Sequence, residues 1–180
     1  HGRKALFFNG NAADEAKRKE FVAALARECE GSEATPKVRL VLHSLAFGTL
    51  RPFIEKDGAE VIGKSHMDMT SDVMGHSLVY WVQDLHRAGL LGRGSRVLSM
   101  TSAGGHRVLP SYGAVSAANA ALESHTRQLA YELAPYGVTA NAVCAGVTDT
   151  PALRKIPGND VMISEAQKRN PAGRLTTPQD

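Results

Sequence analysis

The sequence predicts a parallel α/β sheet, because short apolar runs typical of strands alternate along it with longer segments of helical periodicity. The clearest strands are expected at residues 96–101 and 138–144, and the clearest helices at about 70–88 and 112–133. No repeat or low-complexity linker interrupts this alternation, so a single domain over residues 1–180 is expected. A hydrophobic content of 43% is enough for a substantial core.

The first part of the chain is expected to form a strand, a helix and a second strand. Residues 4–8 are a short apolar run typical of a buried strand. Asn11 is expected to cap a helix with Asp14 at the capping-box position, and Gly31 is expected to end that helix. The run 38–44 is apolar enough for a strand covered on both faces, as in a parallel sheet.

Two long helices are expected in the middle of the chain. Apolar side chains recur at helical spacing over residues 70–88, and Gly89 is expected to terminate this run. Residues 112–133 are expected to form the second helix, leading into the strand at 138–144. A short helix is expected at residues 164–169, after two prolines that break the pattern.

Composition excludes several classes of function. The net charge is +3, and the one tight basic run, residues 17–19, lies among acidic residues as on a solvated helix face, so no nucleic-acid partner is expected. No apolar stretch has the length of a membrane span and no signal peptide opens the chain, so no membrane partner is expected. Cys29 and Cys144 are expected to be free thiols in a reducing cytoplasm. The seven histidines show no paired helical spacing, so no metal site is expected.

The stretch most informative about chemistry runs from Ser99 to Ala114. A strand ends there in hydroxyl residues, a glycine-containing loop follows, and Tyr112 opens a long helix. Because ligands bind at the carboxyl ends of parallel strands, Ser102 is expected to face a site that Tyr112 reaches from the next helix. Taken alone this pattern is weak, since a tyrosine at the start of a helix more often serves packing.

Further motifs fall in the order of one known family. Residues 41–47, Val-Leu-His-Ser-Leu-Ala-Phe, resemble the strand-four motif of enoyl reductases, where a backbone turn contacts the dinucleotide. Residues 96–150 resemble the same family almost continuously, ending in Ala-Gly-Val-Thr-Asp-Thr at 145–150. The tail, residues 171–180, resembles the segment that follows the family's substrate loop. The chain thus resembles the enoyl-(acyl carrier protein) reductases, a branch of the short-chain dehydrogenase/reductase superfamily.

This resemblance implies a Rossmann-like three-layer α/β sandwich that is incomplete. The glycine-rich turn of the family's dinucleotide site does not occur before Lys4, and the match begins near the family's third strand. It stops at Asp180, before the last strand of the family's sheet. We therefore expect a partial Rossmann-like reductase domain, in which the first βαβ unit and the last strand are not present.

Two details favour the enoyl reductases over the carbonyl reductases of the same superfamily. Residues 43–47 read His-Ser-Leu-Ala-Phe where carbonyl reductases usually carry an Asn-Ala-Gly type of turn, and Ala145-Gly146 stands where they usually have Pro-Gly. Ser102 favours the opposite assignment, since bacterial enoyl reductases often place a second aromatic residue there. A carbonyl reductase or alcohol dehydrogenase is therefore kept as an alternative.

The resemblance also implies the reaction and the residues that serve it. NADH or NADPH would deliver hydride to the β-carbon of a double bond conjugated to a thioester, on a small molecule or on an acyl carrier protein. Tyr112 would hydrogen-bond the thioester carbonyl and stabilise the developing enolate, and Ser102 would assist in that contact. The residues implied to hold the cofactor are Ser44, Leu45, Ala46, Gly146, Val147, Thr148 and Thr150.

The basic partner that the family pairs with its tyrosine is missing. That lysine binds the nicotinamide ribose and favours the tyrosinate, and it lies four or seven residues after the tyrosine, within roughly 40° of its direction on the helix. Those positions hold Ser116 and Asn119, and the enoyl-reductase spacing selects Asn119. An amide can hydrogen-bond a ribose but carries no charge. A catalytically inactive relative, serving as a subunit or binding module, is therefore a second alternative.

The resemblance finally implies a cytoplasmic homo-dimer or homo-tetramer. In relatives, the helices that correspond to residues 70–88 and 112–133 pair across a two-fold axis. Aromatic residues on the first of these helices are accordingly expected to serve the core or a subunit contact.

Overall fold

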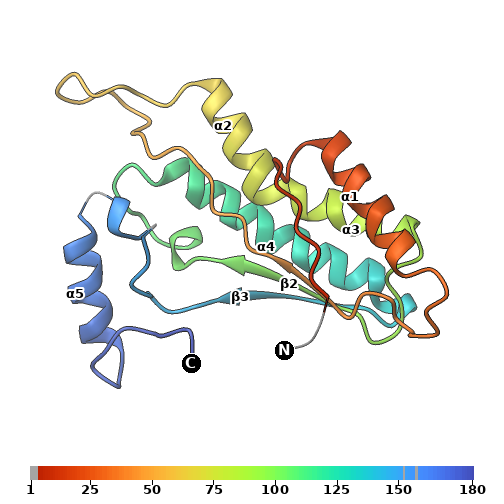
Figure 1. Ribbon diagram of the computed structural model, residues 1–180. Coiled ribbons are helices and arrows are strands. Elements are labelled where there is room, and N and C mark those ends of the chain that lie inside the picture. The colour runs from red at the N-terminus through yellow and green to blue at the C-terminus, as the bar shows by residue number, and fades with distance from the viewer. Residues whose placement is uncertain (1–3, 152, 157) are drawn as a thin grey trace. The chain divides into compact units, whose positions relative to one another are not determined.

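The structure of the protein is a computed structural model, which describes residues 4–151, 153–156 and 158–180. Its contacts divide the chain into two units, His1–Val143 and Cys144–Asp180, and each is described by itself. The expectation of one domain over residues 1–180 stays a prediction. The elements of the first unit, shown in Figure 1, are α1 (Glu15–Glu28), β1 (Leu40–His43), α2 (Lys64–Ser71), the π-helical turn η1 (Asp72–His76), α3 (Ser77–Arg87), β2 (Arg96–Thr101), the 3-10 turn η2 (Ala103–Gly105), α4 (Gly113–Leu133), the 3-10 turn η3 (Ala134–Tyr136) and β3 (Thr139–Cys144), whose last residue opens the second unit.

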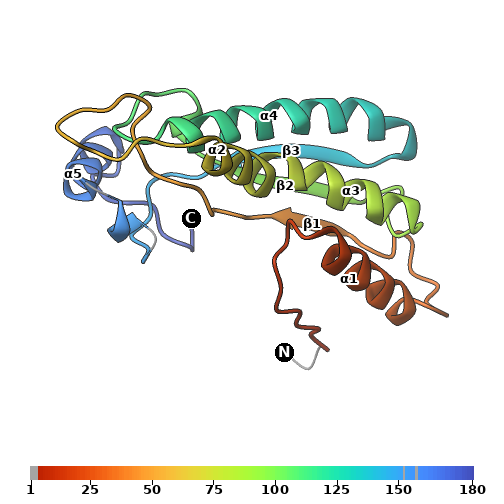
Figure 2. The same ribbon diagram turned by 90° about the horizontal axis from the view of Figure 1, so that it is seen from above.

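Three strands form a sheet in the order β1-β2-β3. β1 and β2 run parallel, with Leu40 opposite Arg96 and His43 opposite Ser99. α3 and α4 extend along these strands, as Figures 1 and 2 show from two directions. The predicted parallel α/β fold class is confirmed.

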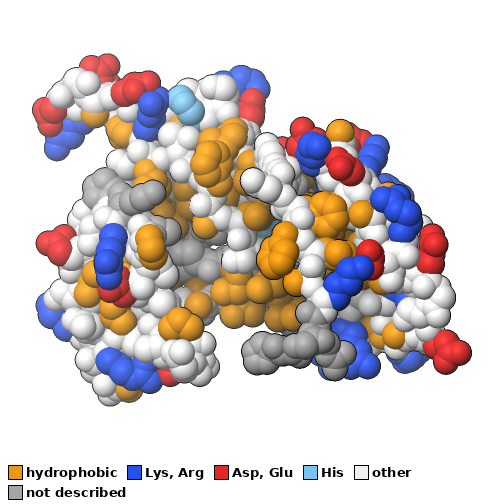
Figure 3. Space-filling model, viewed as in Figure 1, with side chains coloured by type: hydrophobic (Ala, Val, Ile, Leu, Met, Phe, Trp, Pro, Cys, Tyr) orange, Lys and Arg blue, Asp and Glu red, His pale blue; other side chains and the backbone are white. Residues whose placement is uncertain are grey.

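The two faces of this sheet differ in what covers them. On one face His43 hydrogen-bonds Ser77 of α3, and Ser99 hydrogen-bonds Thr126 of α4, both at 2.8 Å. Because these strand residues are buried under the two helices, the helical layer covers this face. Leu40 and Leu42 point to the opposite face and are more than half exposed. Figure 3 shows hydrophobic side chains open to view over this part of the sheet.

α2, η1 and α3 form one continuous helical run that begins at Lys64, earlier than the predicted residue 70. Residues 64–71 at its start are mostly polar, so apolar periodicity does not predict them. An exposed ion pair joins Lys64 to Asp68 there. A single π turn follows, where Gly75 comes so near α4 that a Cβ there would lie 3.2 Å from the carbonyl oxygen of Ala118. Because Gly75 has no side chain, the π turn η1 can lie in direct contact with α4.

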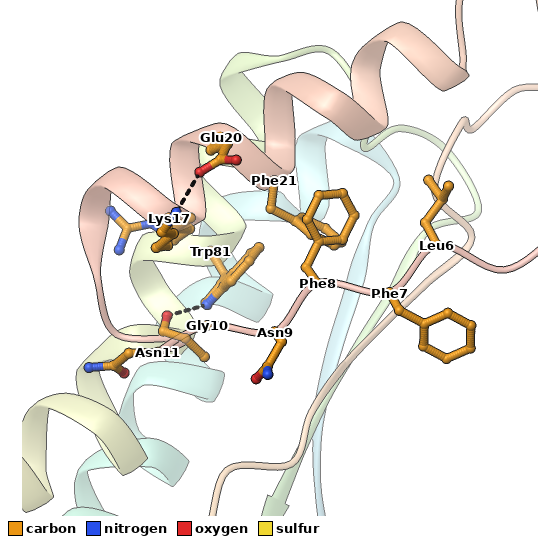
Figure 4. Close-up of a pocket in the computed structure, with 12 residues that line it drawn as sticks. Leu6, Phe7, Phe8, Asn9, Gly10, Asn11, Lys17, Glu20, Phe21 and Trp81 are labelled. Carbon is orange, nitrogen blue, oxygen red and sulfur yellow. Dashed lines mark hydrogen bonds and ion pairs between the residues drawn. The ribbon is translucent and has the colours of Figure 1, made fainter.

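The prediction of a strand at residues 4–8 is wrong. This segment has no regular secondary structure, and no strand in the described part of the chain pairs with it. Phe7 is 92% exposed, whereas Phe8 packs edge-on against Phe21 with ring centroids 4.3 Å apart. Figure 4 shows Phe8, Phe21 and Trp81 pointing toward one another along a pocket of about 390 Å³, with Phe7 turned away. Aromatic packing therefore replaces the backbone pairing that a strand requires.

The ends of two helices also differ from prediction. Asp14, and not Asn11, caps α1, because its carboxylate accepts the backbone N–H of Lys17 at 2.9 Å. The second unit contains a 3-10 turn, η4 (Leu153–Lys155), and the helix α5 (Asn159–Arg169), which begins five residues before the predicted residue 164.

Three further classes of feature bear on function. Across the ranges that the structure describes, no helix combines the length and apolarity required to cross a membrane. Within the same ranges, no three His, Cys, Asp or Glu side chains gather as a metal site would require. Cys29 is partly buried and Cys144 is exposed, and both are free.

A buried ion pair joins α1 to α3. Arg18 donates from Nε to Oδ2 of Asp84 at 2.7 Å, and both side chains are at least nine-tenths buried. The Arg18 guanidinium also lies 5.3 Å from the centroid of the Tyr80 ring. Since removing one partner leaves the other charge buried and unpaired, this pair is costly to break.

We predict that Asp84→Ala lowers the free energy of unfolding by about 3–5 kcal/mol in urea denaturation, because Arg18 keeps its charge without a partner. The matched control is Glu20→Ala, which breaks the exposed ion pair with Lys17 and is expected to cost less than about 1 kcal/mol. Equal losses of unfolding free energy in the two variants would contradict the conclusion that the Arg18–Asp84 pair is costly to break.

Candidate active site

Ser102 begins the loop that follows β2. Its backbone is extended, and its Oγ accepts the backbone N–H of Gly104 at 3.1 Å. The backbone N–H of Gly105 then donates to the carbonyl oxygen of Ser102 at 2.9 Å. These bonds close the one-turn helix η2 and hold Ser102, half-buried, at the carboxyl end of the strand. In a parallel sheet this is the edge where ligands bind.

Tyr112 immediately precedes α4, and its ring packs on the backbone of this loop. A Cβ at Gly104 would lie 2.9 Å from Cδ1 of Tyr112 and closer still to Cε1, so only glycine fits there. Tyr112 also packs against a small buried cluster that includes Met74 and Val115. The structure therefore brings Tyr112 together with the loop that carries Ser102.

Ser111, which sequence reasoning missed, directly precedes Tyr112 and has an unusual backbone conformation. Its φ is 58°, a left-handed conformation that costs a residue with a side chain about 1–2 kcal/mol. The backbone N–H of Tyr112 closes this turn on the carbonyl oxygen of Leu109 at 3.2 Å. Strained backbone concentrates at functional sites. Nothing about a serine at this position predicts a positive φ from the sequence.

Asn119 lies two turns along α4 from Tyr112 and is 3% exposed. Its Nδ2 is buried and has no hydrogen-bond partner among the described residues. Gly105 lies directly over it, since a Cβ at Gly105 would be 3.3 Å from Cβ of Asn119. A buried donor without a partner costs about 1–3 kcal/mol. This amide therefore suits a ligand that brings a hydrogen-bond acceptor, such as a ribose hydroxyl. Ser116, the other position at which the family's lysine could lie, is half-buried.

His43, at the end of β1, is buried and neutral. Its Nε2 is 2.8 Å from Oγ of Ser77, which itself donates to the carbonyl oxygen of Val73 at 2.7 Å. Nε2 must therefore carry the hydrogen. Burial lowers the pKa of His43 to about 4, so the imidazole is uncharged at physiological pH. These contacts suit a residue that shapes the end of the strand, not one that exchanges protons.

Residues 44–46, which are expected to form the turn that contacts the cofactor, follow His43 directly. Ser44 and Ala46 are exposed, and Leu45 is half-buried. The chain is then anchored by Thr49, whose backbone N–H donates to Oγ1 of Thr70 at 3.1 Å. A Cβ at Gly48 would lie 2.7 Å from Val115 and 2.8 Å from Thr70. This glycine therefore lets the segment after the turn press against both α2 and α4.

Residues 146–150, the remaining expected cofactor contacts, belong to the second unit. Thr176 organises them: its backbone N–H donates to the carbonyl oxygen of Val147 at 3.0 Å, and it pairs with Thr148 in a parallel bridge. A Cβ at Gly146 would lie 3.1 Å from Cβ of Thr176 and closer to its hydroxyl. Thr150 accepts the backbone N–H of Leu153 through Oγ1 at 3.1 Å. Thr150 thus caps the turn η4.

Comparison with known proteins decides the family. A family model described as enoyl-(acyl carrier protein) reductase matches residues 1–180. The chain belongs to the enoyl-(acyl carrier protein) reductase family.

Several proteins similar in sequence to this chain are named as reductases. The enoyl-(acyl-carrier-protein) reductase (NADH) of Aquifex aeolicus is 30% identical over 141 residues, which are 78% of this chain and 51% of that protein. The Escherichia coli enzyme of the same name is 28% identical over 147 residues, covering 81% and 54%. The 1-cyclohexenylcarbonyl-CoA reductase of Streptomyces collinus is 33% identical over 92 residues, covering 51% and 32%. The chain thus spans about half the length of the first two relatives.

Solved structures of the family share the fold. The crystal structure of the Aquifex aeolicus enzyme superposes with a TM-score of 0.76 at 25% identity, covering 92% of this chain and 61% of that one. The Bacillus cereus enoyl-acyl carrier protein reductase, solved with NADP+ and indole naphthyridinone, gives a TM-score of 0.82 at 21% identity, covering 98% and 65%. At that identity the second likeness shows the fold alone.

We predict that His43 makes stability depend on pH. An unfolded histidine takes up a proton below its ordinary pKa of 6.5, whereas folded His43 stays neutral until about pH 4. Protonation therefore favours unfolding, and stability is lost as pH falls from 6.5 toward 4. Between pH 7 and pH 5 the loss from this residue should be about 2 kcal/mol, measured by urea denaturation.

The control for this prediction is His43→Gln, which keeps a donor for Ser77 but cannot titrate. His125, whose pKa is lowered by burial and by His76, is present in both proteins and cancels in the comparison. If the variant loses as much stability between the two pH values as the parent protein, His43 is not the titrating group.

Proposed function

We propose that this protein is an NADH- or NADPH-dependent oxidoreductase that reduces the double bond of enoyl thioesters. The observation that carries the proposal is the packing of the Tyr112 ring on the Ser102 loop, at the carboxyl end of β2. Asn119, a buried amide whose Nδ2 has no partner in the described part of the chain, lies on the same helix face. Membership of the family supports the reaction class, and the names of the relatives support a thioester substrate.

Tyr112 would donate a hydrogen bond to the thioester carbonyl oxygen. That oxygen gains negative charge as the β-carbon is reduced and an enolate forms, so a donor aimed at it stabilises the transition state more than the substrate. Ser102 would assist: its Oγ accepts from Gly104, and its O–H can donate toward the same oxygen. The enolate then takes up a proton from solvent at the α-carbon.

The cofactor would contact Asn119, residues 44–46 and residues 146–150. Asn119 would donate from Nδ2 to a ribose hydroxyl, which would satisfy a donor that is otherwise buried without a partner. Residues 44–46 would line the path of the dinucleotide, and residues 146–150 would hold its nicotinamide half. When bound, the nicotinamide supplies the hydride for the β-carbon.

We further propose that the thioester is linked to an acyl carrier protein and that the protein is a homo-dimer or homo-tetramer. The carrier is the one that the names of the Aquifex and Escherichia relatives state. A second candidate function, a binding module without turnover, is favoured by one observation. Asn119 places no positive charge beside Tyr112, where the family resemblance implies a lysine.

We predict that a crotonyl thioester, incubated with NADH or NADPH, is reduced with measurable oxidation of the cofactor. Tyr112→Phe should lower kcat by about 10²–10⁴-fold, because it removes the donor to the enolate. Tyr131→Phe is the matched control, since Tyr131 lies on the same helix and is 79% exposed. Cofactor oxidation with a 3-oxoacyl thioester but none with the crotonyl thioester would instead assign a carbonyl reductase.

We predict that Asn119→Lys raises kcat about tenfold or more, since about 1.4 kcal/mol of added stabilisation by a nearby ammonium corresponds to that factor. Binding of NADH, followed by its fluorescence, is measured on the same samples. The control is Asn141→Lys, a new charge at an exposed position on β3. Absent turnover in Asn119→Lys, with NADH still bound, would favour the binding module.

A further inference from the structure

Glu123 lies on the same face of α4 as Tyr112 and Asn119, one turn beyond Asn119. Its two carboxylate oxygens have different partners. Oε1 accepts from Oγ1 of Thr101 at 2.7 Å, and Oε2 is 2.7 Å from Nε2 of His106. One side chain of the helix therefore holds two separate points of the chain.

These two points are the ends of the Ser102 loop. Thr101 is the last residue of β2, and His106 is the residue that ends η2. Between them, Gly105 rests on the helix, since a Cβ there would lie 3.6 Å from Oε1 of Glu123. The loop 102–105 is thus fastened at both ends to the helix that Tyr112 begins.

The electrostatics of the carboxylate suit this role. Burial acts to raise the pKa of Glu123, but the hydrogen bonds from Thr101 and His106, with the charges of His106 and Arg127, lower it below its usual value. The side chain of Glu123 is 15% exposed, whereas that of His106 is 67% exposed. Water therefore competes less for the part-buried contact with Thr101 than for the contact with His106. Hydrogen bonds to an ionised acceptor are about twice as strong as neutral ones.

We propose that Glu123 is a positioning residue: it clamps both ends of the Ser102 loop to α4 and so sets Ser102 against Tyr112. The clamp itself is a property of the fold, whereas its effect on turnover rests on the proposed function. Glu123 touches neither Tyr112 nor Ser102 in this arrangement; it acts through Thr101 and His106.

The first test is amide hydrogen exchange, which needs neither cofactor nor substrate. The backbone N–H groups of Gly104, Gly105 and His106 all donate within the loop, so their exchange reports whether it is closed. In Glu123→Ala their exchange should accelerate about tenfold or more, since two hydrogen bonds to a charged group are lost. Exchange in the central turns of α4 should stay within about twofold of the parent protein.

Matched variants separate the clamp from a general loss of stability. Glu132→Ala removes an exposed carboxylate from the same helix and should leave loop exchange unchanged. Thr101→Val and His106→Ala each remove one arm, and each should accelerate loop exchange less than Glu123→Ala does. They also keep the proposal testable if Glu123→Ala does not fold. Unchanged loop exchange, or equal acceleration throughout α4, would overturn the proposal.

The second test concerns catalysis. With the crotonyl thioester, Glu123→Ala should lower kcat about tenfold or more while the KM for NADH stays within about twofold, because the loop positions the reacting groups. Glu123→Gln keeps the size and one acceptor, and should recover part of the lost rate. A raised KM with unchanged kcat would overturn the positioning role. If the parent protein itself gives no turnover, the proposed function fails, whereas the exchange experiment still decides the clamp.

Discussion

The close approach of the loop 102–105 to α4 is the contact on which the candidate site depends. Two consecutive glycines make it possible, because Gly104 lies on the ring of Tyr112 and Gly105 lies over Asn119. A methyl group at Gly104 would occupy space that the aromatic ring fills, and interiors packed to this density do not absorb such an addition without movement. The absence of side chains at Gly104 and Gly105 therefore determines the shape of the site as much as the side chains that line it do.

The helix supplies the second half of this arrangement. Tyr112, Asn119 and Glu123 are spaced by seven and four residues, so all three face the loop. Each contributes something different: a phenol hydroxyl, a buried amide with a free donor, and a carboxylate that fastens the loop. Positive charge is the element that the family resemblance leads one to expect here, and Asn119 does not provide it.

Much of this could be predicted from the sequence, because periodicity reports burial. The strand at 96–101 and the long helices followed from it. Helix geometry admitted Ser116 and Asn119 as the residues to compare with the family's lysine, and the spacing implied by the resemblance to enoyl reductases selected Asn119. The strand expected at residues 4–8 was wrong because apolar composition does not supply a neighbouring strand. The ring of Phe8 packs instead against Phe21 of α1, which packs in turn against Trp81 of α3. The left-handed Ser111 and the clamp by Glu123 were missed, since both depend on a loop folding back onto a helix distant in sequence.

The most direct test of the central claim is to follow deuterium from 4-deuterated NADH into the product of a crotonyl thioester. The account predicts a butyryl thioester that carries the label at the β-carbon and solvent hydrogen at the α-carbon, because in the proposed reaction Tyr112 and Ser102 would stabilise a carbonyl oxygen that becomes an enolate. A product labelled at the α-carbon would contradict it. So would label found only in the 3-hydroxyacyl product of a 3-oxoacyl thioester.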